Sequence, residues 1–293
     1  MLYICPTPIG NLQDVTLRVL DALKEAELIA CEDTRHTRIL LARYGITTRL
    51  VSFHDYNEEQ RLGMLLPLLR DGRDIAVVSD AGMPGLSDPG FTLVRACAEE
   101  GIAVTVLPGP SAIPTALVLS GLPSDRFAFV GFLARGKAKL LEQLARFEGT
   151  GATLVAFESP RRIQASLLAI AERWPDRPVA VCRELTKIHE EAIRGTAIEV
   201  LERLEKPVRG EIVLVIGSGG GAAVGAAASG RAGAGDSALT GTGLDERARV
   251  ALGELNALGV GTKRAAAVVS RLTGLPARRV YGLAVSGERQ AEK

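Results

Sequence analysis

The sequence has few cysteines and few aromatic side chains. The spacing of the cysteines argues against a zinc-binding or a disulfide-stabilised protein. The 293 residues include four cysteines, at Cys5, Cys31, Cys97 and Cys182. They lie far apart, without the paired spacing of zinc sites or disulfide frameworks. We interpret them as reduced, mostly buried thiols of a cytoplasmic protein. His36 and His54 have no partners at metal-ligand spacing, so no metal site is predicted.

Long hydrophobic runs are also missing. No uninterrupted apolar run approaches the roughly 20 residues that a membrane-spanning helix needs, so no membrane span is expected. The N-terminal stretch MLYICPTPIG has no basic region, which argues against a secretory signal. With 47% hydrophobic and 24% charged residues, the chain is long enough for two ordinary domains with a core each. The net charge of +1 neither demands nor excludes a nucleic-acid partner.

Three common functional motifs are absent from the sequence. No G-x-G-x-x-G follows the first expected strand, and no G-x-x-x-x-G-K-[ST] occurs anywhere. No serine or cysteine lies in a nucleophile-elbow context. These absences argue against a dinucleotide-binding protein, a P-loop NTPase and a hydrolase with a nucleophilic triad.

Short β-branched runs alternate with amphipathic stretches in the first part of the chain. The runs LYIC, ELIAC, RLVSF, DIAVVS and AVTVL predict strands at 2–5, 27–31, 49–53, 74–79 and 103–107. This alternation predicts βα units and a mainly parallel sheet. Capping residues predict helix starts at Asp88-Pro89, Ser111 and Ser159-Pro160. Glycines predict helix ends at Gly45, Gly101 and Gly121.

A second set of elements follows residue 120. The runs FAFVGF, TLVAF, VAVC and EIVLVI predict strands, and helices are expected at about 137–147, 160–173 and 196–204. We therefore predict an N-terminal α/β domain over 1–120 and a second α/β domain over 121–217. Residues 218–243 are rich in Gly and Ala and predict a flexible linker. Residues 244–286 predict a small helical module, and from Leu244 onward nine Lys/Arg stand against five Asp/Glu.

Three loops rich in glycine and proline follow strands of the first domain, over 6–11, 79–90 and 107–112. Ligands of open parallel sheets bind at the carboxyl ends of the strands, and glycine lets the backbone approach a ligand closely. A shared pocket is therefore expected. The plainer alternative is that each loop is an ordinary turn and helix cap, with Asp88 capping a helix that starts at Pro89.

Two charged clusters also follow strands, at 31–41 and 182–195. In the first cluster, the plainer interpretation of Asp33-Thr34 is a helix cap. In the second cluster, the plainer interpretation is a solvated helix face whose salt bridges contribute little to stability.

Seven motifs together carry a resemblance. They are TPIGNLQD, CEDTRHTRILLARYGI, SFHDYNE, VVSDAGMPGLSDPG, LPGPSA, FESPRR and CRELTKIHEE. These motifs follow one another as they do in the tetrapyrrole-methylase-like (class III) S-adenosylmethionine-dependent methyltransferases. The chain resembles the branch of that family that methylates ribose 2′-hydroxyls of 16S rRNA. The resemblance covers residues 2 to about 217, and more weakly a tail similar to a helix-turn-helix-like module.

The resemblance implies two α/β domains of tetrapyrrole-methylase type, with S-adenosylmethionine in the cleft between them. It also implies a homodimer, a 16S rRNA or small-subunit substrate, and methylation of a cytidine in the decoding region. A corrin or porphyrin methylase is the first alternative. It is disfavoured because TPIGNLQD keeps only Gly10 of the glycine-rich run that those enzymes carry after the first strand. A non-catalytic RNA-binding module is the second alternative.

The resemblance and the loop positions lead to three groups of site residues. The expected cofactor-binding residues are Pro8, Asp80, Ala81, Gly82, Met83, Asp88, Ser111 and Ala112. The candidates to flank the acceptor hydroxyl are Glu184, Lys187, Asp33 and Arg35. The expected RNA contacts are Asn11, Lys137, Arg161, Arg162 and Arg183, together with basic residues of the tail. The residue that removes the hydroxyl proton is not predicted.

Overall fold

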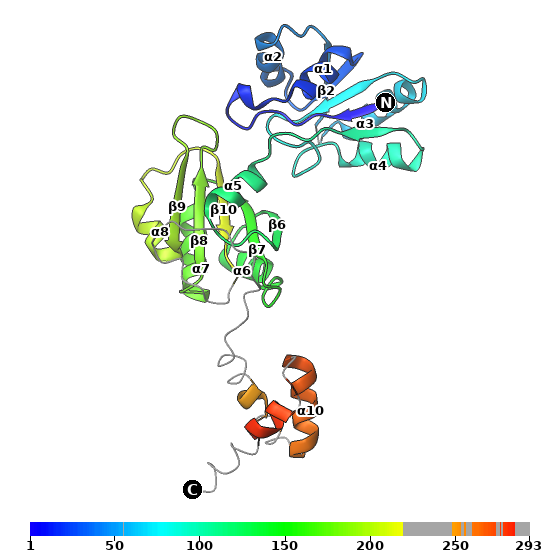
Figure 1. Cartoon of the computed structure of the whole chain (residues 1–293). Coiled ribbons are helices and arrows are strands. Elements are labelled where there is room, and N and C mark those ends of the chain that lie inside the picture. Colours follow the sequence, from blue (N-terminus) through cyan, green and yellow to red (C-terminus); the bar gives the residue numbers. More distant parts are fainter. Residues whose placement is uncertain are drawn as a thin grey trace. The chain divides into compact units, whose positions relative to one another are not determined.

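The computed structural model describes residues 1–54, 56–218, 248–252, 255, 260–273, 276 and 278–284. The chain divides into two compact units, Met1–Gly225 and Ala226–Lys293. The first unit contains two five-stranded sheets with helices on their faces (Figure 1). The predicted linker, apart from Ser218, lies outside the described residues.

The first sheet is entirely parallel, as predicted. Its strands are β1 (Leu2–Ile4), β2 (Leu28–Cys31), β3 (Arg49–Ser52), β4 (Ile75–Val78) and β5 (Val104–Val106). They lie in the order β3-β2-β4-β1-β5. Every residue of β2 and β4 is buried, which fits the uninterrupted apolar runs of a sheet covered on both faces.

Helices cover both faces of this sheet. The elements between its strands are η1 (Leu12–Asp14), α1 (Leu17–Glu25), α2 (Thr34–Arg43), α3 (Glu58–Arg70) and α4 (Phe91–Glu99). Apolar residues of α1 and α2 share one buried cluster with one face of the sheet. Those of α3 and α4 share another with the opposite face. The helices start at the caps that the sequence offers: the side chains of Thr16 and Asp33 accept backbone N–H groups of α1 and α2.

The second sheet is mixed. It contains β6 (Phe127–Phe132), β7 (Thr153–Glu158), β8 (Pro178–Arg183), β9 (Glu191–Thr196) and β10 (Ile212–Ile216). The strand order is β6-β7-β10-β8-β9, and only β6 and β7 pair in parallel.

Strand β9 corrects one expectation, because the plainer interpretation of residues 182–195 was a solvated helix face. The chain instead leaves β8, turns over residues 184–190 and returns as β9, with Cys182 opposite Ala192. Glu184 and Thr186 have φ of 53° and 65°, and these left-handed conformations are incompatible with a continuous helix. No helix forms between β8 and β9.

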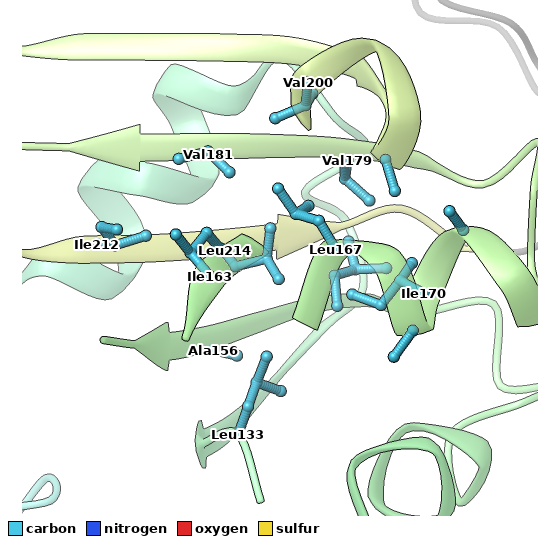
Figure 2. Close-up of a cluster of buried hydrophobic side chains, with 14 of the residues drawn as sticks. Leu133, Ala156, Ile163, Leu167, Ile170, Val179, Val181, Val200, Ile212 and Leu214 are labelled. Carbon is cyan, nitrogen blue, oxygen red and sulfur yellow. The ribbon is translucent and has the colours of Figure 1, made fainter. Parts of the chain in front are cut away.

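One face of the second sheet is covered by α6 (Lys137–Ala145), α7 (Ile163–Arg173) and α8 (Ala197–Arg203). Figure 2 shows the core on this side, where Leu167 and Ile170 of α7 and Val200 of α8 lie against Val181 and Leu214 of the sheet. Each labelled side chain in this layer is buried, so the packing follows the apolar stripe of each helix.

The other face of the second sheet is covered by α5 (Ala112–Ser120). Ile113, Ala116 and Leu117 pack with Val155 and Val213 of the sheet. Helix α5 was predicted as the last part of the first domain, but it packs on the second sheet. The division between the two α/β lobes therefore falls between β5 and α5 rather than at residue 120, because the apolar surface of α5 is buried there.

The predicted helix ends are confirmed, whereas the predicted starts are confirmed only in part. Gly45, Gly101 and Gly121 follow α2, α4 and α5 with φ of 64°, 69° and 69°. Helix α4 begins at Phe91 after Gly90, so Asp88 does not cap it. Ser111 precedes α5 without a side-chain capping bond. Helix α7 begins at Ile163, three residues after Pro160, because residues 160–162 form a turn.

The described part of the second unit is helical, as predicted. Residues 248–252, α10 (Thr262–Thr273) and residues 278–284 form helical segments. Their buried residues are Ala248, Leu252, Ala265, Ala266, Val269, Val280 and Ala284, and these form one cluster of their own. Within the described ranges of both units, no helix is long and apolar enough to cross a membrane.

Candidate functional site

A cavity of about 350 Å³ opens between the two lobes of the first unit. Four segments contribute most of its lining: residues 81–88 after β4, residues 111–113 at the start of α5, residues 157–160 at the end of β7, and residues 210–213 at the start of β10. Ile9, Phe132 and Leu185 complete it. The volume is in the usual range for small-molecule sites.

Hydrogen bonds between the loops after β1 and β4 shape one wall of this cavity. Thr7 and Gly82 exchange two backbone hydrogen bonds, each 2.9 Å long. The Thr7 hydroxyl donates to the carbonyl oxygen of Ser79 at 3.0 Å. Gly82 has φ of +81°, a conformation that glycine adopts without the steric cost of a side chain. These bonds fix the course of the loop, and at Gly82 no side chain stands between the backbone and the cavity.

The opposite wall is largely apolar. Phe157 packs edge to face with Phe129 and Phe132, at centroid distances of 4.9 and 5.4 Å. Ile212 and Val213 of β10 line the same side. A flat aromatic or heterocyclic ring fits such a surface.

Six of the eight predicted cofactor residues line this cavity, and they are Ala81, Gly82, Met83, Asp88, Ser111 and Ala112. The other two, Pro8 and Asp80, line a second cavity of about 290 Å³ beside it. The two cavities share Ile9, Ala81 and Glu211. The structure thus gathers the three loops that the sequence singled out, but distributes their residues over two adjoining spaces.

The second cavity is bounded by the loop after β1 and by α2. His36, Thr37, Ile39 and Leu40 of α2 line it, as does Lys187 from the turn between β8 and β9. Its surface carries groups of both charges: Lys187 is a cationic hydrogen-bond donor, and the carboxylates of Asp80 and Glu211 are anionic acceptors.

Lys187 belongs to a charged cluster at the border of this cavity. Its Nζ atom lies 3.0 Å from Glu184 Oε1 and 3.1 Å from Glu211 Oε2. Glu184 Oε1 also accepts the Glu211 backbone N–H at 3.0 Å. Gly10 makes room for the lysine, because a Cβ atom on Gly10 would lie 2.6 Å from Lys187 Cγ. The structure therefore brings together Glu184 and Lys187, both predicted for the acceptor side.

The cluster keeps both groups charged. Burial by itself raises the pKa of Glu184, but the Glu211 N–H and the Lys187 ammonium outweigh it and lower that pKa. Burial by itself lowers the pKa of Lys187, but the carboxylates of Glu184 and Glu211 outweigh it and raise that pKa. An ionised Glu184 with a lowered pKa is a weak proton acceptor. The cluster is therefore better suited to positioning than to proton removal.

Asp33 and Arg35, the other two acceptor-side candidates, lie at the start of α2. Asp33 Oδ1 accepts the Arg35 backbone N–H at 2.8 Å, as a helix cap does. The side chains pair at 2.7 Å, and the Arg35 guanidinium holds the pKa of Asp33 well below its usual range. Neither side chain lines a cavity in the part of the chain that the structure describes. Their proposed role at the hydroxyl stays a prediction.

The five predicted RNA contacts lie on four segments of the chain, because Arg161 and Arg162 are neighbours in the turn before α7. Asn11 caps η1, Lys137 pairs with Glu172, Arg161 is exposed, Arg162 pairs with Glu158, and Arg183 pairs with Glu191 and Glu205. Only 14% of the Arg183 side chain is exposed. The contact of these five residues with RNA stays a prediction.

Glu158 is a site residue that the sequence interpretation missed. Its side chain is completely buried and lines the first cavity. Its carboxylate accepts the Ser159 N–H and the Ser166 hydroxyl, both at 2.6 Å, and pairs with Arg162 at 2.6 Å. The available signal was an acid at the end of the apolar run TLVAFE, within the FESPRR motif. The network holds the end of β7 at the cavity.

The first cavity fits S-adenosylmethionine by the chemistry of its lining. The backbone at Gly82 is open to close approach because no Cβ covers it. Met83 and Phe157 offer an apolar surface for an adenine ring, and the carboxylates of Asp88 and Glu211 line the same cavity, where they would stabilise positive groups.

Solved structures with the same fold support this architecture. A crystal structure of diphthine synthase aligns with a TM-score of 0.60 and 13% identity, over 74% of this chain and 89% of that one. A uroporphyrin-III-C-methyltransferase from Thermus thermophilus aligns with a TM-score of 0.52 and 23% identity, over 74% and 94% of the two chains. At these identities the likeness shows the fold alone.

Sequence relatives are closer. Proteins named ribosomal RNA small subunit methyltransferase I are 47% identical in Halalkalibacterium halodurans (75% of this chain and 76% of that protein) and 47% in Thermotoga maritima (73% and 97%). The protein of that name in Bacillus subtilis is 45% identical over 74% of each chain. The family model of tetrapyrrole (corrin/porphyrin) methylases matches residues 1–201. The predicted resemblance and fold class are confirmed: this chain belongs to the tetrapyrrole methylase family and, within it, to the group of ribosomal RNA small subunit methyltransferase I proteins.

Proposed function

We propose that this protein transfers a methyl group from S-adenosylmethionine to rRNA of the small ribosomal subunit. The finer proposal is that the acceptor is the ribose 2′-hydroxyl of a cytidine in the decoding region of 16S rRNA. The names of the relatives support an rRNA substrate, and the motifs quoted above support ribose methylation by resemblance. The observation that carries the proposal is the pair of adjoining cavities, since methyl transfer needs a cofactor and an acceptor side by side.

In this proposal the first cavity binds the cofactor. Gly82 lets the cofactor approach the backbone closely, Ser111 and Ala112 close the facing side, and Asp88 supplies a carboxylate. S-adenosylmethionine would supply an electrophilic methyl group when it is bound, and S-adenosylhomocysteine would leave because the sulfur–methyl bond breaks as the methyl group is transferred. The protein's own task is to hold cofactor and acceptor in line and to exclude water, which accounts for much of the available rate enhancement in displacements of this kind.

The acceptor hydroxyl approaches the border between the cavities, where Ala81 and Glu211 face both. Glu184 holds Lys187 at this border through the 3.0 Å contact. The lysine ammonium orients the ribose or an adjacent phosphate, and the hydroxyl proton leaves to a carboxylate or to water as the new O–C bond forms. Glu184 is thus a positioning residue, and Lys187 contacts the substrate.

We further propose that the protein works as a cytoplasmic homodimer, as the family resemblance implies. Exposed apolar side chains in the first unit, among them Phe91 (68% exposed) and Val118 (76% exposed), are compatible with an interface between copies.

The proposed function is tested by incubating the protein with radiolabelled S-adenosylmethionine and small ribosomal subunits, or free 16S rRNA. Mass spectrometry of nuclease fragments then maps any new methyl group. One 2′-O-methylcytidine in the decoding region is expected. Cofactor binding without transfer to rRNA, or a methyl group on a base rather than on a ribose, would contradict the proposal.

A further inference from the structure

The second cavity opens beside a stretch of chain whose charged side chains are all basic. Residues 34–54 contain four arginines and two histidines, and no Asp or Glu. Three of the arginines, Arg35, Arg38 and Arg43, lie on α2 and are exposed. Arg49 begins β3, the edge strand of the first sheet, and is exposed as well.

Three of these four arginines have no carboxylate partner among the residues that the structure describes. Arg35 pairs with Asp33, whereas Arg38, Arg43 and Arg49 form no ion pair with any residue that the structure describes. Three other exposed arginines of the first lobe differ in this respect, since Arg70, Arg73 and Arg95 each pair with a glutamate. Helix α2 therefore has cationic groups that a polyanion could neutralise without breaking an existing ion pair.

The same helix forms a wall of the second cavity. His36, Thr37, Ile39 and Leu40 line it, and Ile39 is 60% exposed although it contributes to the lining. Ile39 therefore lies at the mouth of the second cavity. The cavity volume, about 290 Å³, is close to the lower end of the range for small-molecule sites.

We propose that the second cavity takes the acceptor nucleoside of a single-stranded RNA, and that Arg38 and Arg43 of α2 contact the phosphates that flank it. This inference rests on the proposed function, and it names the surface by which the RNA enters. The cavity offers apolar contacts from Ile39 and Leu40 to a base, and hydrogen-bonding groups from Asp80 and Lys187 to a sugar. Unpaired RNA is the form whose bases can leave a stack and enter a protein cavity.

The phosphate contacts are tested with the double variant Arg38→Ala/Arg43→Ala of the full chain. Its affinity for a short fluorescein-labelled single-stranded RNA is measured by anisotropy over a range of salt concentrations. Affinity should fall about tenfold, and the slope of log K against log salt should become shallower by about 0.7 for each phosphate that the protein no longer neutralises. S-adenosylmethionine affinity, measured by calorimetry, should stay at the wild-type value.

A matched control is Arg70→Ala/Arg95→Ala. These residues lie on α3 and α4, which cover the opposite face of the same sheet, and the net charge changes equally. This control should bind the RNA with wild-type affinity and slope. An equal loss of affinity in both double variants would mean that only net charge matters, and would overturn the inference.

The cavity itself is tested with Ile39→Asp, which places a carboxylate at the mouth without changing a buried residue. Methyl transfer and RNA affinity should both fall at least tenfold while cofactor affinity is kept. The control is Leu168→Asp on α7, where the native side chain is 51% exposed. Wild-type transfer by Ile39→Asp would overturn the placement of the nucleoside.

The outcomes separate this inference from the proposed function. If the wild-type protein methylates rRNA but the Arg38/Arg43 variant binds RNA like the wild type, the inference is wrong and the proposed function stands. If the wild-type protein transfers no methyl group, the proposed function fails. The RNA affinities of the two double variants still test whether Arg38 and Arg43 contact RNA. A variant that keeps RNA affinity but changes the oligomeric state in light scattering would identify α2 as an interface between copies, which also overturns the inference.

Discussion

The Oδ1 atom of Asp80 accepts a hydrogen bond from the backbone N–H of Asp33 at 3.0 Å. These residues follow the neighbouring strands β4 and β2, so the bond joins the loop between the two cavities to the start of α2. The Asp80 N–H in turn lies 3.5 Å from Glu32 Oε2. The position of the Ala81–Met83 loop therefore depends on a contact between residues 47 positions apart in the sequence.

Replacing Asp80 with alanine should weaken S-adenosylmethionine binding. Loss of a charge-assisted hydrogen bond costs about 1.5 kcal/mol, or roughly tenfold in affinity, because the loop beside the first cavity is no longer held. Asp80→Asn retains an acceptor oxygen and should lose less. Calorimetry of both variants checks this, with Asp21→Ala on the exposed side of α1 as a control. Equal affinities in all three variants would show that Asp80 does not support the cofactor site.

Gly82→Val should reduce cofactor affinity more than it reduces stability. A β-branched residue at φ of +81° is strained by about 1–2 kcal/mol, and the added side chain meets Ile9 Cγ2 at the cavity wall, since an ideal Cβ lies 3.5 Å from it. The matched control is Gly45→Val, at φ of +64° with nothing within 4 Å. Both variants should lose similar stability in urea denaturation, and only Gly82→Val should lose cofactor binding. Similar binding in the two would remove Gly82 from the site.

Lys187→Met should lower the rate of methyl transfer while leaving S-adenosylmethionine affinity near the wild-type value. The lysine lines the second cavity and not the first, so its ammonium acts on the acceptor. A loss of about tenfold to a hundredfold in kcat is expected for a positioning contact. Single-turnover assays measure it, with Lys24→Met on α1 as the exposed control. A variant that loses cofactor affinity instead would assign Lys187 to the cofactor side.

Glu158→Ala should be the most destabilising of these changes. It removes the partner of Arg162 and leaves the Ser166 hydroxyl without its acceptor in a buried setting. Breaking a buried pair in this way costs about 3–5 kcal/mol. Glu172→Ala is the control, because Glu172 pairs with Lys137 at the surface with 67% of its side chain exposed, and such pairs contribute roughly 0–1 kcal/mol. Urea denaturation compares them, and equal midpoints would contradict the role assigned to Glu158.

The cysteine thiols should resist modification in the folded protein. Burial raises the pKa of Cys5 to about 12, and burial is the main cause that raises those of Cys31 and Cys182 to about 11. Burial also raises the pKa of Cys97. Because the thiolate is the reactive form, a thiol reagent at about pH 8 should modify four cysteines in urea and almost none in buffer.

The same pKa shifts predict that the free energy of unfolding decreases as the pH rises above the usual thiol pKa. The folded pKa values lie above those of the unfolded chain, so the neutral thiols contribute their full stability below about pH 8.5, the usual thiol pKa. That stability should fall as the pH rises toward 11. The free energy of unfolding in urea should therefore be lower at about pH 10 than at about pH 8. Fast labelling of a thiol in folded protein at about pH 8 would contradict both expectations.

Much of the fold could be predicted because its elements carry local signals. The strands of the first sheet are short apolar runs, and Gly45, Gly101 and Gly121 end helices in conformations that favour glycine. Strand β9 was missed because EAIRGT carries charges and has no continuous apolar run. Its pairing partner β8 supplies the stabilisation that local propensity lacks. The sequence could not show that α5 belongs to the second sheet, because an apolar helix can pack on either neighbour.

The sequence by itself determined the strands of the first sheet, the glycine-rich loops at their ends, and the motifs that place the chain in its family. Only the tertiary structure decided which side chains meet. The separation of Asp80 from Gly82 into adjoining cavities, and the cluster of Lys187 with Glu184 and Glu211, depend on strand order and loop geometry. The reason is physical: local propensity is encoded over a few neighbouring residues, whereas contacts between distant loops arise only when the sheets have assembled.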